Sequence, residues 1–424
     1  MTLLASALLV PLAVFLMTAC GADPTATPVP TATPVPPTAT PVPEQPAQPE
    51  PAAPTATPTV DAMAEFQAEW DALVAAAQEE GELVVILGGS ASRAFRPVVE
   101  EFGRRFDINA IPAAGRDGEH VDRILAERAG GRYLVDATHL GPTTSRTRAI
   151  PAGLFDDIHQ HLFHPEVINL DNWFKGRLWF ADETEKYLLT HSAGISSVVT
   201  GYYNTDLVSQ EDVDAIQSVY DYLDPKWKGQ IVSVPLDTAG AGGTWYGLYV
   251  HPEVGTDWIE RFVREMDVEY TDEARVIADG VATGKWAWGI AIGAAGRDIR
   301  GLAAEGLPVA ELSKLLSEAP TLSGSGSSNN TAIFTQPAHP NAAKLYINWF
   351  LSKEGQTVMH EMSDISPAPT LRVDGVPWGK TLEEERRVEG QDYYFLSADP
   401  EYLKLHEEAI AFSRGVYAEA TGQN

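Results

Sequence analysis

The strongest constraint on this chain is a tract at residues 21–60 that cannot build a hydrophobic core. The hexapeptide Thr-Ala-Thr-Pro-Val-Pro occurs three times there, and 13 of the chain's 30 prolines lie between Pro24 and Pro58. Such a sequence buries too little apolar surface to offset the entropy lost on folding, and its prolines favour an extended backbone. We therefore predict that residues 21–60 form a disordered tether and that the folded body begins near residue 61.

An apolar run precedes the tether. It extends from Leu3 to Met17 and is shorter than the roughly 20 residues of a membrane-spanning helix, so it fits the core of a signal peptide over residues 1–20. The run ends in Leu16-Met17-Thr18-Ala19-Cys20, which resembles a bacterial lipobox. That resemblance implies that Cys20 becomes the lipidated first residue of an extracytoplasmic protein anchored to the cell membrane. A stray cysteine in a leader is the alternative.

Charge and cysteine content exclude several classes of protein. The chain of 424 residues has 30 Lys and Arg against 59 Asp and Glu, a formal charge of −29. This balance argues against nucleic-acid partners and against electrostatic docking on anionic lipid. Cys20 is the only cysteine, which excludes internal disulfides and cysteine-ligated metals in the body, and argues against a cysteine nucleophile.

The body has the pattern of an α/β protein. Residues 62–80 carry apolar side chains at helical spacing, and the apolar run 83–87 that follows is typical of a buried parallel strand. A small-residue turn and an amphipathic helix complete one βα unit. Further short strands are predicted at 108–111, 134–138, 197–203, 230–234, 286–292 and 331–334. Further helices are predicted at 121–129, 218–223, 244–250, 256–266, 273–283, 341–351 and 402–414.

Four segments, in their order and spacing, resemble the extracellular solute-binding proteins of ABC importers. The similarity is to the branch that includes ferric-iron, polyamine and phosphonate binders. The segments are Glu80–Val85, Tyr202–Thr205, Asp224–Ile231 and Pro340–Gln356.

The resemblance implies a two-lobed, type II periplasmic-binding-protein-like fold with hinge strands and an interlobe cleft that closes on a solute. It implies a first lobe of residues 61–197 plus 331–370 and a second lobe of residues 198–330 plus 371–424. We expect a monomeric receptor that is no enzyme and that delivers its solute to a membrane permease and ATPase. The alternatives are an anchored secreted hydrolase and a solute sensor with the same fold.

Candidate ligand-binding residues follow from the rule that ligands of open α/β sheets lie outside the carboxyl ends of the strands. Small residues there let backbone N–H groups approach a solute, and Arg297 could pair with a carboxylate or phosphonate. The alternatives are a plain glycine-rich connection, a surface arginine balanced by Asp298, and a tryptophan that packs in the core. The candidates are Gly88, Gly89, Ser90, Ser92, His139, Ser197, Asp237, Thr238, Gly240, Trp245, Gly293 and Arg297.

One departure from the family argues against iron. Ferric binders of this branch carry adjacent tyrosines just after the strand that corresponds to 286–292, where this chain has Ala294-Ala295. Ser90 stands where such binders often have a histidine, and Tyr202 and Tyr203 are expected on opposite faces of a strand. We therefore expect a small polar or anionic solute and no cofactor.

Two other chemistries were considered. His159, His161 and His164 have a spacing seen at zinc sites, with a solvated loop as the alternative. Two hydrolase motifs are not matched: the Gly-rich turn 240–243 lacks the Gly-Lys-Ser/Thr ending of a phosphate-binding loop, and Ser323–Ser327 lacks the strand-to-helix context of a nucleophile elbow. A Ser–His–Asp catalytic set remains an alternative at this point.

Overall fold

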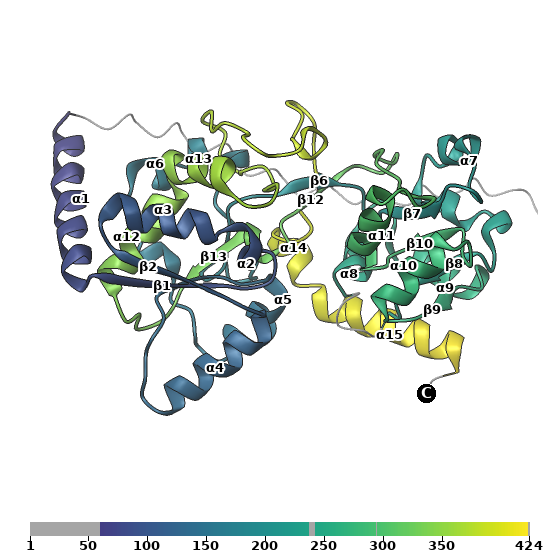
Figure 1. Cartoon of the computed structure of the whole chain (residues 1–424), viewed down its shortest axis with the longest axis horizontal. Helices are drawn as coiled ribbons and strands as arrows, with labels where there is room; N and C mark the ends of the chain where they lie inside the picture. Colours follow the sequence, from purple (N-terminus) through teal and green to yellow (C-terminus); the bar gives the residue numbers. More distant parts are fainter. Residues whose placement is uncertain (1–59, 237–241, 294, 423–424) are drawn as a thin grey trace, which may run out of the picture. The chain divides into compact units, whose positions relative to one another are not determined.

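The computed structural model describes residues 60–236, 242–293 and 295–422, which form an α/β structure with two mixed sheets (Figure 1). The first sheet has the strand order β2-β1-β3-β13-β5-β4. β1, β2 and β3 run parallel, whereas β13 is antiparallel to β3 and to β5. Its strands are β1 (Glu82–Leu87), β2 (Asn109–Ala114), β3 (Ala137–His139), β4 (Trp179–Phe180), β5 (Leu189–Thr190) and β13 (Asn330–Ile333).

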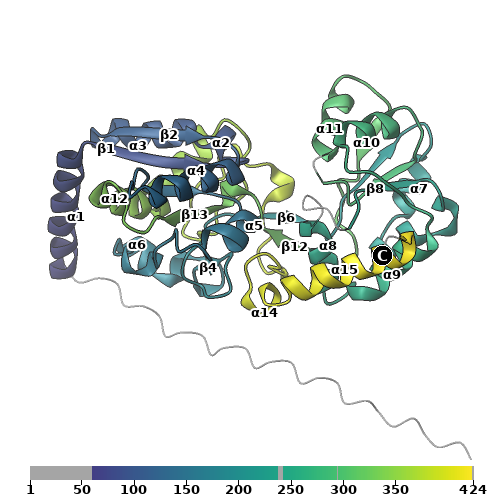
Figure 2. The same ribbon diagram turned by 90° about the horizontal axis from the view of Figure 1, so that it is seen from below.

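Amphipathic helices cover the first sheet because their apolar stripes match its buried side chains. In α3 (Arg96–Phe106), Val98, Val99 and Phe102 are fully buried. The long helix α1 (Val60–Glu80) packs along α12 (Pro340–Leu351), as Figures 1 and 2 show, so segments far apart in sequence share this core. The other helices near this sheet are α2 (Ala91–Ala94), α4 (Asp117–Ala129), α5 (Pro142–Thr144), α6 (Pro165–Ile168) and α13 (Lys353–Met362).

The second sheet has the order β11-β7-β10-β8-β9. β8 lies parallel to β10 and β9, whereas β7 is antiparallel to β10 and β11. The strands are β7 (Gly201–Asn204), β8 (Ile231–Ser233), β9 (Glu269–Tyr270), β10 (Trp288–Ile290) and β11 (Val309–Glu311). The helices are α7 (Gln210–Ala215), α8 (Gly242–Val250), α9 (Gly255–Glu265), α10 (Ala274–Ala282), α11 (Ala295–Ala304) and α15 (His406–Thr421).

A two-stranded antiparallel ribbon connects the two sheets. The chain leaves the first sheet through β6 (Gly194–Ser196) and returns from the second through β12 (Thr321–Ser323). The hydroxyl of Thr321 donates to the carbonyl of Ser196 at 3.1 Å, which joins the two crossing strands. Figure 1 shows β6 and β12 between the helices of the two sheets. That the ribbon acts as a hinge stays a prediction.

The C-terminal segment contributes to both cores. Leu371, Tyr393 and Phe395 pack in the core of the first sheet, whereas Val416 and Tyr417 of α15 pack in the core of the second. The division into lobes remains a prediction. These contacts lead us to propose that residues 371–398 join the first lobe, and that α14 (Pro400–Leu403) leads into the part that braces the second.

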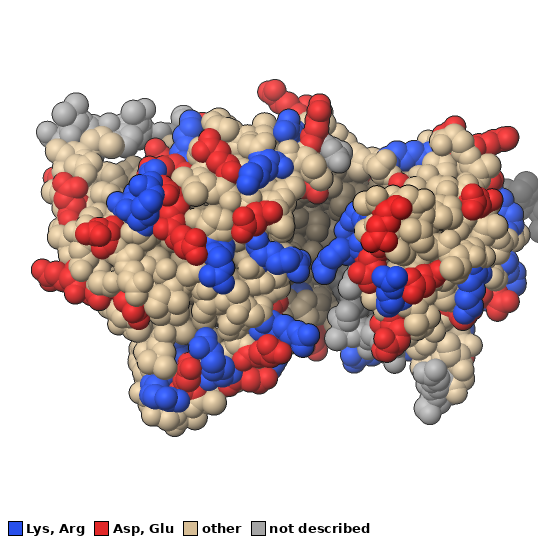
Figure 3. Space-filling view, viewed as in Figure 1, with Lys and Arg blue, Asp and Glu red and all other residues tan. Residues whose placement is uncertain are grey.

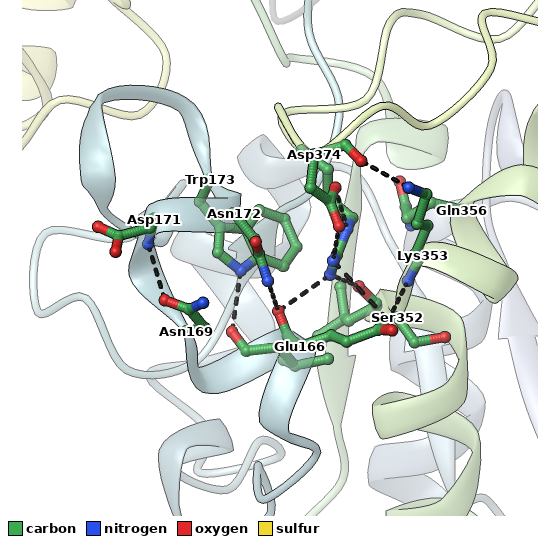
Figure 4. A network of polar contacts seen from close by, with 12 residues as sticks. Glu166, Asn169, Asp171, Asn172, Trp173, Ser352, Lys353, Gln356 and Asp374 are labelled. Atoms are coloured by element: carbon green, nitrogen blue, oxygen red, sulfur yellow. Dashed lines mark hydrogen bonds and ion pairs between the residues drawn. The ribbon is translucent and has the colours of Figure 1, made fainter. Parts of the chain in front are cut away.

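A buried arginine holds the start of that segment against the first sheet's helices. Arg372 is 3% exposed and donates to the carbonyl of Leu351 at 2.9 Å and to that of Glu166 at 3.2 Å. Its Nε donates to the Asp374 carboxylate at 3.0 Å. Figure 4 shows Asp374 and Glu166 within this polar network, beside Trp173. A buried charge is tolerated here because the guanidinium is both paired and hydrogen-bonded.

Most predicted elements are present within a few residues of their predicted bounds. The strand predicted at 134–138 lies at 137–139, because Leu134 is exposed and only the following residues enter the sheet. The helix predicted at 62–80 is α1. None of the helices in the described part of the chain combines the length and apolar character needed to span a membrane. Residues 1–59, with the predicted signal peptide and all of the predicted tether except Val60, lie outside the described residues, and Val60 is the first residue of α1.

Replacing Asn330 tests the connection between the ribbon and the first sheet. This buried side chain accepts from Thr190 Oγ1 at 2.7 Å and donates to the carbonyls of Gly324 and Gly326 at 2.8 Å each. Asn330→Ala leaves these groups unpaired, so we expect urea unfolding to show a loss of about 2–4 kcal/mol. Asn109→Ala, at an exposed site, is the control and should change stability by less than about 0.5 kcal/mol. Equal effects of the two substitutions would contradict the role of Asn330.

Candidate functional site

A cavity of about 410 Å³ lies beside the β6–β12 ribbon and is lined from both sheets' sides. This volume is within the range of small-molecule sites. Figure 3 shows a hollow between the part with the first sheet and the part with the second, with Lys and Arg on both of its borders. The polar, aromatic and glycine residues of the lining include Thr143, Arg146, Ser196, Ser197, Thr200, Tyr202, Thr244, Tyr246, Gly293, Thr321, Ser323, Ser325, Ser397 and His406.

Each wall of the cavity comes from a different structural feature. The exit of β3 leads through Pro142 into α5 and then into a single π-helical turn, Ser145–Ala149, which carries Arg146. The ribbon contributes Ser196 and Thr321. Helices α8 and α15 contribute Tyr246 and His406.

Arg146 has no direct partner among the described residues. The side chain is half-buried, and no hydrogen bond or ion pair joins its guanidinium to another described residue. Burial lowers its pKa, while Tyr246, Glu183 and Asp182 oppose that shift. The guanidinium therefore remains charged at neutral pH, because arginine starts from a very high pKa.

Several hydroxyl groups in the cavity also lack protein partners. The side chains of Thr143, Ser197 and Thr200 make no hydrogen bond to another described residue, whereas those of Ser196 and Thr321 bond to each other. No described residue of the lining is an Asp or Glu. The cavity therefore offers donors and positive charge in a chain whose formal charge is −29.

Two rings form an aromatic wall. Tyr246 and His406 have ring centroids 5.1 Å apart, and the Tyr246 hydroxyl donates to the carbonyl of Leu396 at 2.9 Å. Burial, followed by the charge of Arg146, lowers the pKa of His406 to about 4. The imidazole is therefore neutral at pH 7 and leaves Arg146 as the charged side chain among the described lining residues.

The backbone after β10 has an uncommon conformation where it borders the cavity. Ala291 has a φ of +53° and Gly293 a φ of +54°, and both line the cavity. The left-handed region costs a residue with a Cβ about 1–2 kcal/mol. The turn directs the chain from the end of β10 toward α11 and presents backbone groups to the cavity.

The structure brings only some of the predicted residues together. Ser197 and Gly293 line the cavity. Trp245 is 1% exposed in the second core, against Trp258 and Phe262, and Arg297 is an exposed residue of α11 that does not line it. We therefore remove Trp245 and Arg297 from the candidate site. The other predicted positions of the glycine-rich turn, together with the lipidation site, lie outside the described residues: Asp237, Thr238, Gly240 and Cys20.

The glycine- and serine-rich turn after β1 has a packing role instead. A Cβ at Gly88 would overlap the Asp117 carboxylate, and the Ser327 hydroxyl donates to the carbonyl of Gly88 at 2.7 Å. Ser90 bonds to the hydroxyl groups of Ser327 and Ser328. The turn thus packs against Ser327 and Ser328, which lie just before β13 and which the predicted division placed in the second lobe. Gly88, Gly89, Ser90 and Ser92 do not line the cavity.

His139 is also a structural residue. Its ring is fully buried, with Nδ1 2.9 Å from the carbonyl of Asn330 and Nε2 2.8 Å from the hydroxyl of Tyr346. Both ring nitrogens are occupied within the core, so His139 is not available to a solute in the cavity. The backbone of His139 lies at a strand exit, as predicted. Its side chain, however, points into the core that the first sheet forms with α12.

The three histidines with metal-like spacing bond to different partners. His159 contacts the carbonyl of Glu185, His161 the carboxylate of Asp156, and His164 accepts from the backbone N–H of Glu166. Among the described residues, no group of three or more His, Cys, Asp or Glu is placed to hold a metal ion. The zinc hypothesis gains no support from this arrangement.

Tyr202 and Tyr203 lie on opposite faces of β7, as expected. The Tyr202 hydroxyl accepts from Arg300 at 2.8 Å, whereas the ring of Tyr203 packs 5.2 Å from that of Trp288. Two phenols that point apart cannot chelate one ion. This pair therefore does not form a two-phenol site, and the expectation against iron stays a prediction.

Comparisons with known proteins identify the fold. No protein-family model matches the chain, and no curated protein matches it. Iron-bound HitA from Pseudomonas aeruginosa is similar in structure, with a TM-score of 0.51 and 19% identity over 79% of this chain and 99% of that one. The periplasmic binding protein AfuA from Actinobacillus pleuropneumoniae, with fructose-6-phosphate bound, has a TM-score of 0.51 and 16% identity over 81% and 99%.

IdiA (FutA) from Trichodesmium, in complex with iron and citrate, is similar with a TM-score of 0.54 and 16% identity over 79% of this chain and 99% of that one. The fold is that of type II periplasmic binding proteins, which confirms the predicted fold class.

The buried His139 predicts a loss of stability in acid. Burial lowers the pKa of its imidazole to about 3, below the ordinary value of 6.5. As pH falls below 6.5, His139 therefore binds a proton in the unfolded chain but stays neutral in the folded chain. This one group should lower the free energy of unfolding by about 2 kcal/mol at pH 5. Urea unfolding at pH 7 and pH 5 measures the loss, and NMR titration of the His139 ring assigns it. A ring that titrates near pH 6.5 in the folded protein would contradict this account.

Proposed function

We propose that this protein is a lipid-anchored, extracytoplasmic receptor of an ABC importer. It captures a small polar or anionic solute in the cavity beside the β6–β12 ribbon and passes it to a membrane permease and ATPase. The observation that carries the proposal is the position of the cavity. Its lining comes from both sides of the ribbon that connects the two sheets, and it contains hydrogen-bond donors without protein partners.

The mechanism is closure about the ribbon. A solute that contacts Arg146 on the first sheet's side and residues of α8 or β7 on the second stabilises the closed state by its higher affinity for that state. Such a movement would turn on the two crossing strands and on the C-terminal segment, which contributes to both cores. The solute needs no covalent chemistry to be captured and released.

The bound solutes of similar structures support the class of ligand but do not name it. AfuA was solved with a sugar phosphate, and HitA with iron. Iron fits this chain poorly, because Tyr202 and Tyr203 diverge and Ala295 occupies a position where ferric binders have a phenol. The unpaired donors of the cavity fit a small organic solute with several acceptor oxygens.

Closure can be measured directly because the chain has one cysteine. We expect spin labels at Arg132→Cys and Glu305→Cys, in a Cys20→Ala background, to approach one another when a solute from a small-molecule library binds. A pair at Arg132→Cys and Glu100→Cys, both on the first sheet's side, should keep its distance. The solute should be recovered unchanged by mass spectrometry. Turnover of the solute without any change in the first distance would favour the hydrolase.

The anchor is a separate prediction. Cys20→Ala removes the proposed lipid attachment, so we expect the protein to move from the membrane fraction to the soluble fraction of the cell. Near-ultraviolet circular dichroism of the variant should match that of the wild type, because Cys20 precedes the tether. Mass spectrometry of the wild-type N-terminus provides the control. An unmodified wild type in the soluble fraction would contradict lipid anchoring.

A further inference from the structure

The charge of the cavity opposes the charge of the chain. The formal charge is −29, yet no described residue of the cavity lining is acidic and Arg146 is basic. Lys and Arg also lie on both borders of the hollow in Figure 3. Arg146 is thus the charged side chain among the described lining residues, although Asp182 and Glu183 are close enough to influence it.

The guanidinium of Arg146 is left free although carboxylates are near. Asp182 influences its pKa, but that carboxylate already accepts from the hydroxyl of Thr184 at 2.6 Å and from the backbone N–H of Leu188 at 2.9 Å. Glu183 is exposed to solvent. A half-buried guanidinium with five donors and no direct partner is an arrangement that an incoming anion would complete.

Hydroxyl donors accompany the guanidinium. Thr143 lies three residues before Arg146, so the two side chains are near neighbours on one helical surface. Ser197 and Thr200 come from the crossing segment between β6 and β7 and also line the cavity. None of these three hydroxyls bonds to another described residue. Acceptor oxygens of a solute would therefore find donors from two separate segments of the chain.

We propose that the solute is an organic anion and that Arg146 binds its phosphate or carboxylate group, with Thr143, Ser197 and Thr200 as flanking donors. This inference rests on the proposed function and names the solute class and a binding residue. A cationic solute would meet the guanidinium without a compensating carboxylate. A neutral solute would leave the guanidinium unpaired when the cavity closes, which is costly.

His406 provides a local reporter for the test. Its ring lines the same cavity as Arg146, so an anion at the guanidinium changes the electrostatic field at the imidazole. The experiment follows the His406 ring by NMR in the full-length protein. Inorganic phosphate is added up to about 10 mM, which is ten times the Kd of about 1 mM that we assume for phosphate and the wild type. The variants are Arg146→Gln, Arg146→Lys and the control Arg297→Gln, which removes an exposed arginine outside the cavity.

We expect phosphate to shift the His406 signals in the wild type and in Arg297→Gln. Arg146→Gln should weaken phosphate binding by about 10- to 100-fold, the effect of one lost charge-assisted contact. Arg146→Lys should retain part of the affinity, which separates loss of charge from loss of fold. The spin-label pair described above then compares glucose 6-phosphate, citrate, glucose and spermidine. Closure with glucose 6-phosphate or citrate identifies the anionic group as phosphate or carboxylate.

Distinct outcomes separate this inference from the receptor function. Equal phosphate affinity in Arg146→Gln and the wild type, or no response of His406 to phosphate in the wild type, overturns the inference. Closure with glucose or spermidine that survives Arg146→Gln also overturns it and leaves the receptor function intact. Phosphate binding that depends on Arg146, without closure in the presence of any solute, supports the anion site and argues against the receptor.

Discussion

The hydrogen bonds of Asn330 determine where the crossing ribbon meets the first sheet. Its side chain joins β5, through Thr190, to the carbonyls of Gly324 and Gly326 in the returning loop. Its backbone carbonyl accepts from the Nδ1–H of His139 in β3 at 2.9 Å. Each of these groups is buried and would be costly to leave unpaired. These bonds therefore fix the position at which β13 enters the first sheet. The position of the β6–β12 ribbon beside the cavity follows from it.

The same loop explains why the glycine-rich exit of β1 does not face the cavity. Ser327 bonds to the carbonyl of Gly88, and a Cβ at Gly89 would come within 2.8 Å of the Ser327 hydroxyl. The small residues there permit the exit of β1 and the loop before β13 to approach closely. At Ala291 and Gly293 the left-handed backbone instead borders open space. Glycines at a strand exit thus permit close packing after β1 of the first sheet, whereas after β10 of the second sheet Gly293 forms part of the cavity wall.

The fold was predictable because its signals are local. Apolar spacing identified α1 and α3, and the short apolar runs identified β1, β8 and β10. The site was predictable only at Ser197 and Gly293, which lie next to strands. Arg146, Tyr246 and His406 were missed because they come from helical segments about 100 and 160 residues apart. Only the packing of α15 along α8 brings the last two rings together. The sequence offers a polar turn before Arg146 but no local signal for its partners.

An acidic protein that binds an anion faces opposing electrostatic effects at different distances. The net charge of −29 repels an anion far from the surface, but the Debye length in physiological salt is only about 8 Å, so most of that repulsion is screened. Within the cavity, screening is weaker and the guanidinium of Arg146, which makes no ion pair with a described residue, has the larger effect. Long-range charge therefore governs solubility and partner choice, whereas selection of the solute depends on a few donors beside the ribbon. That separation permits the surface to remain acidic without weakening the site.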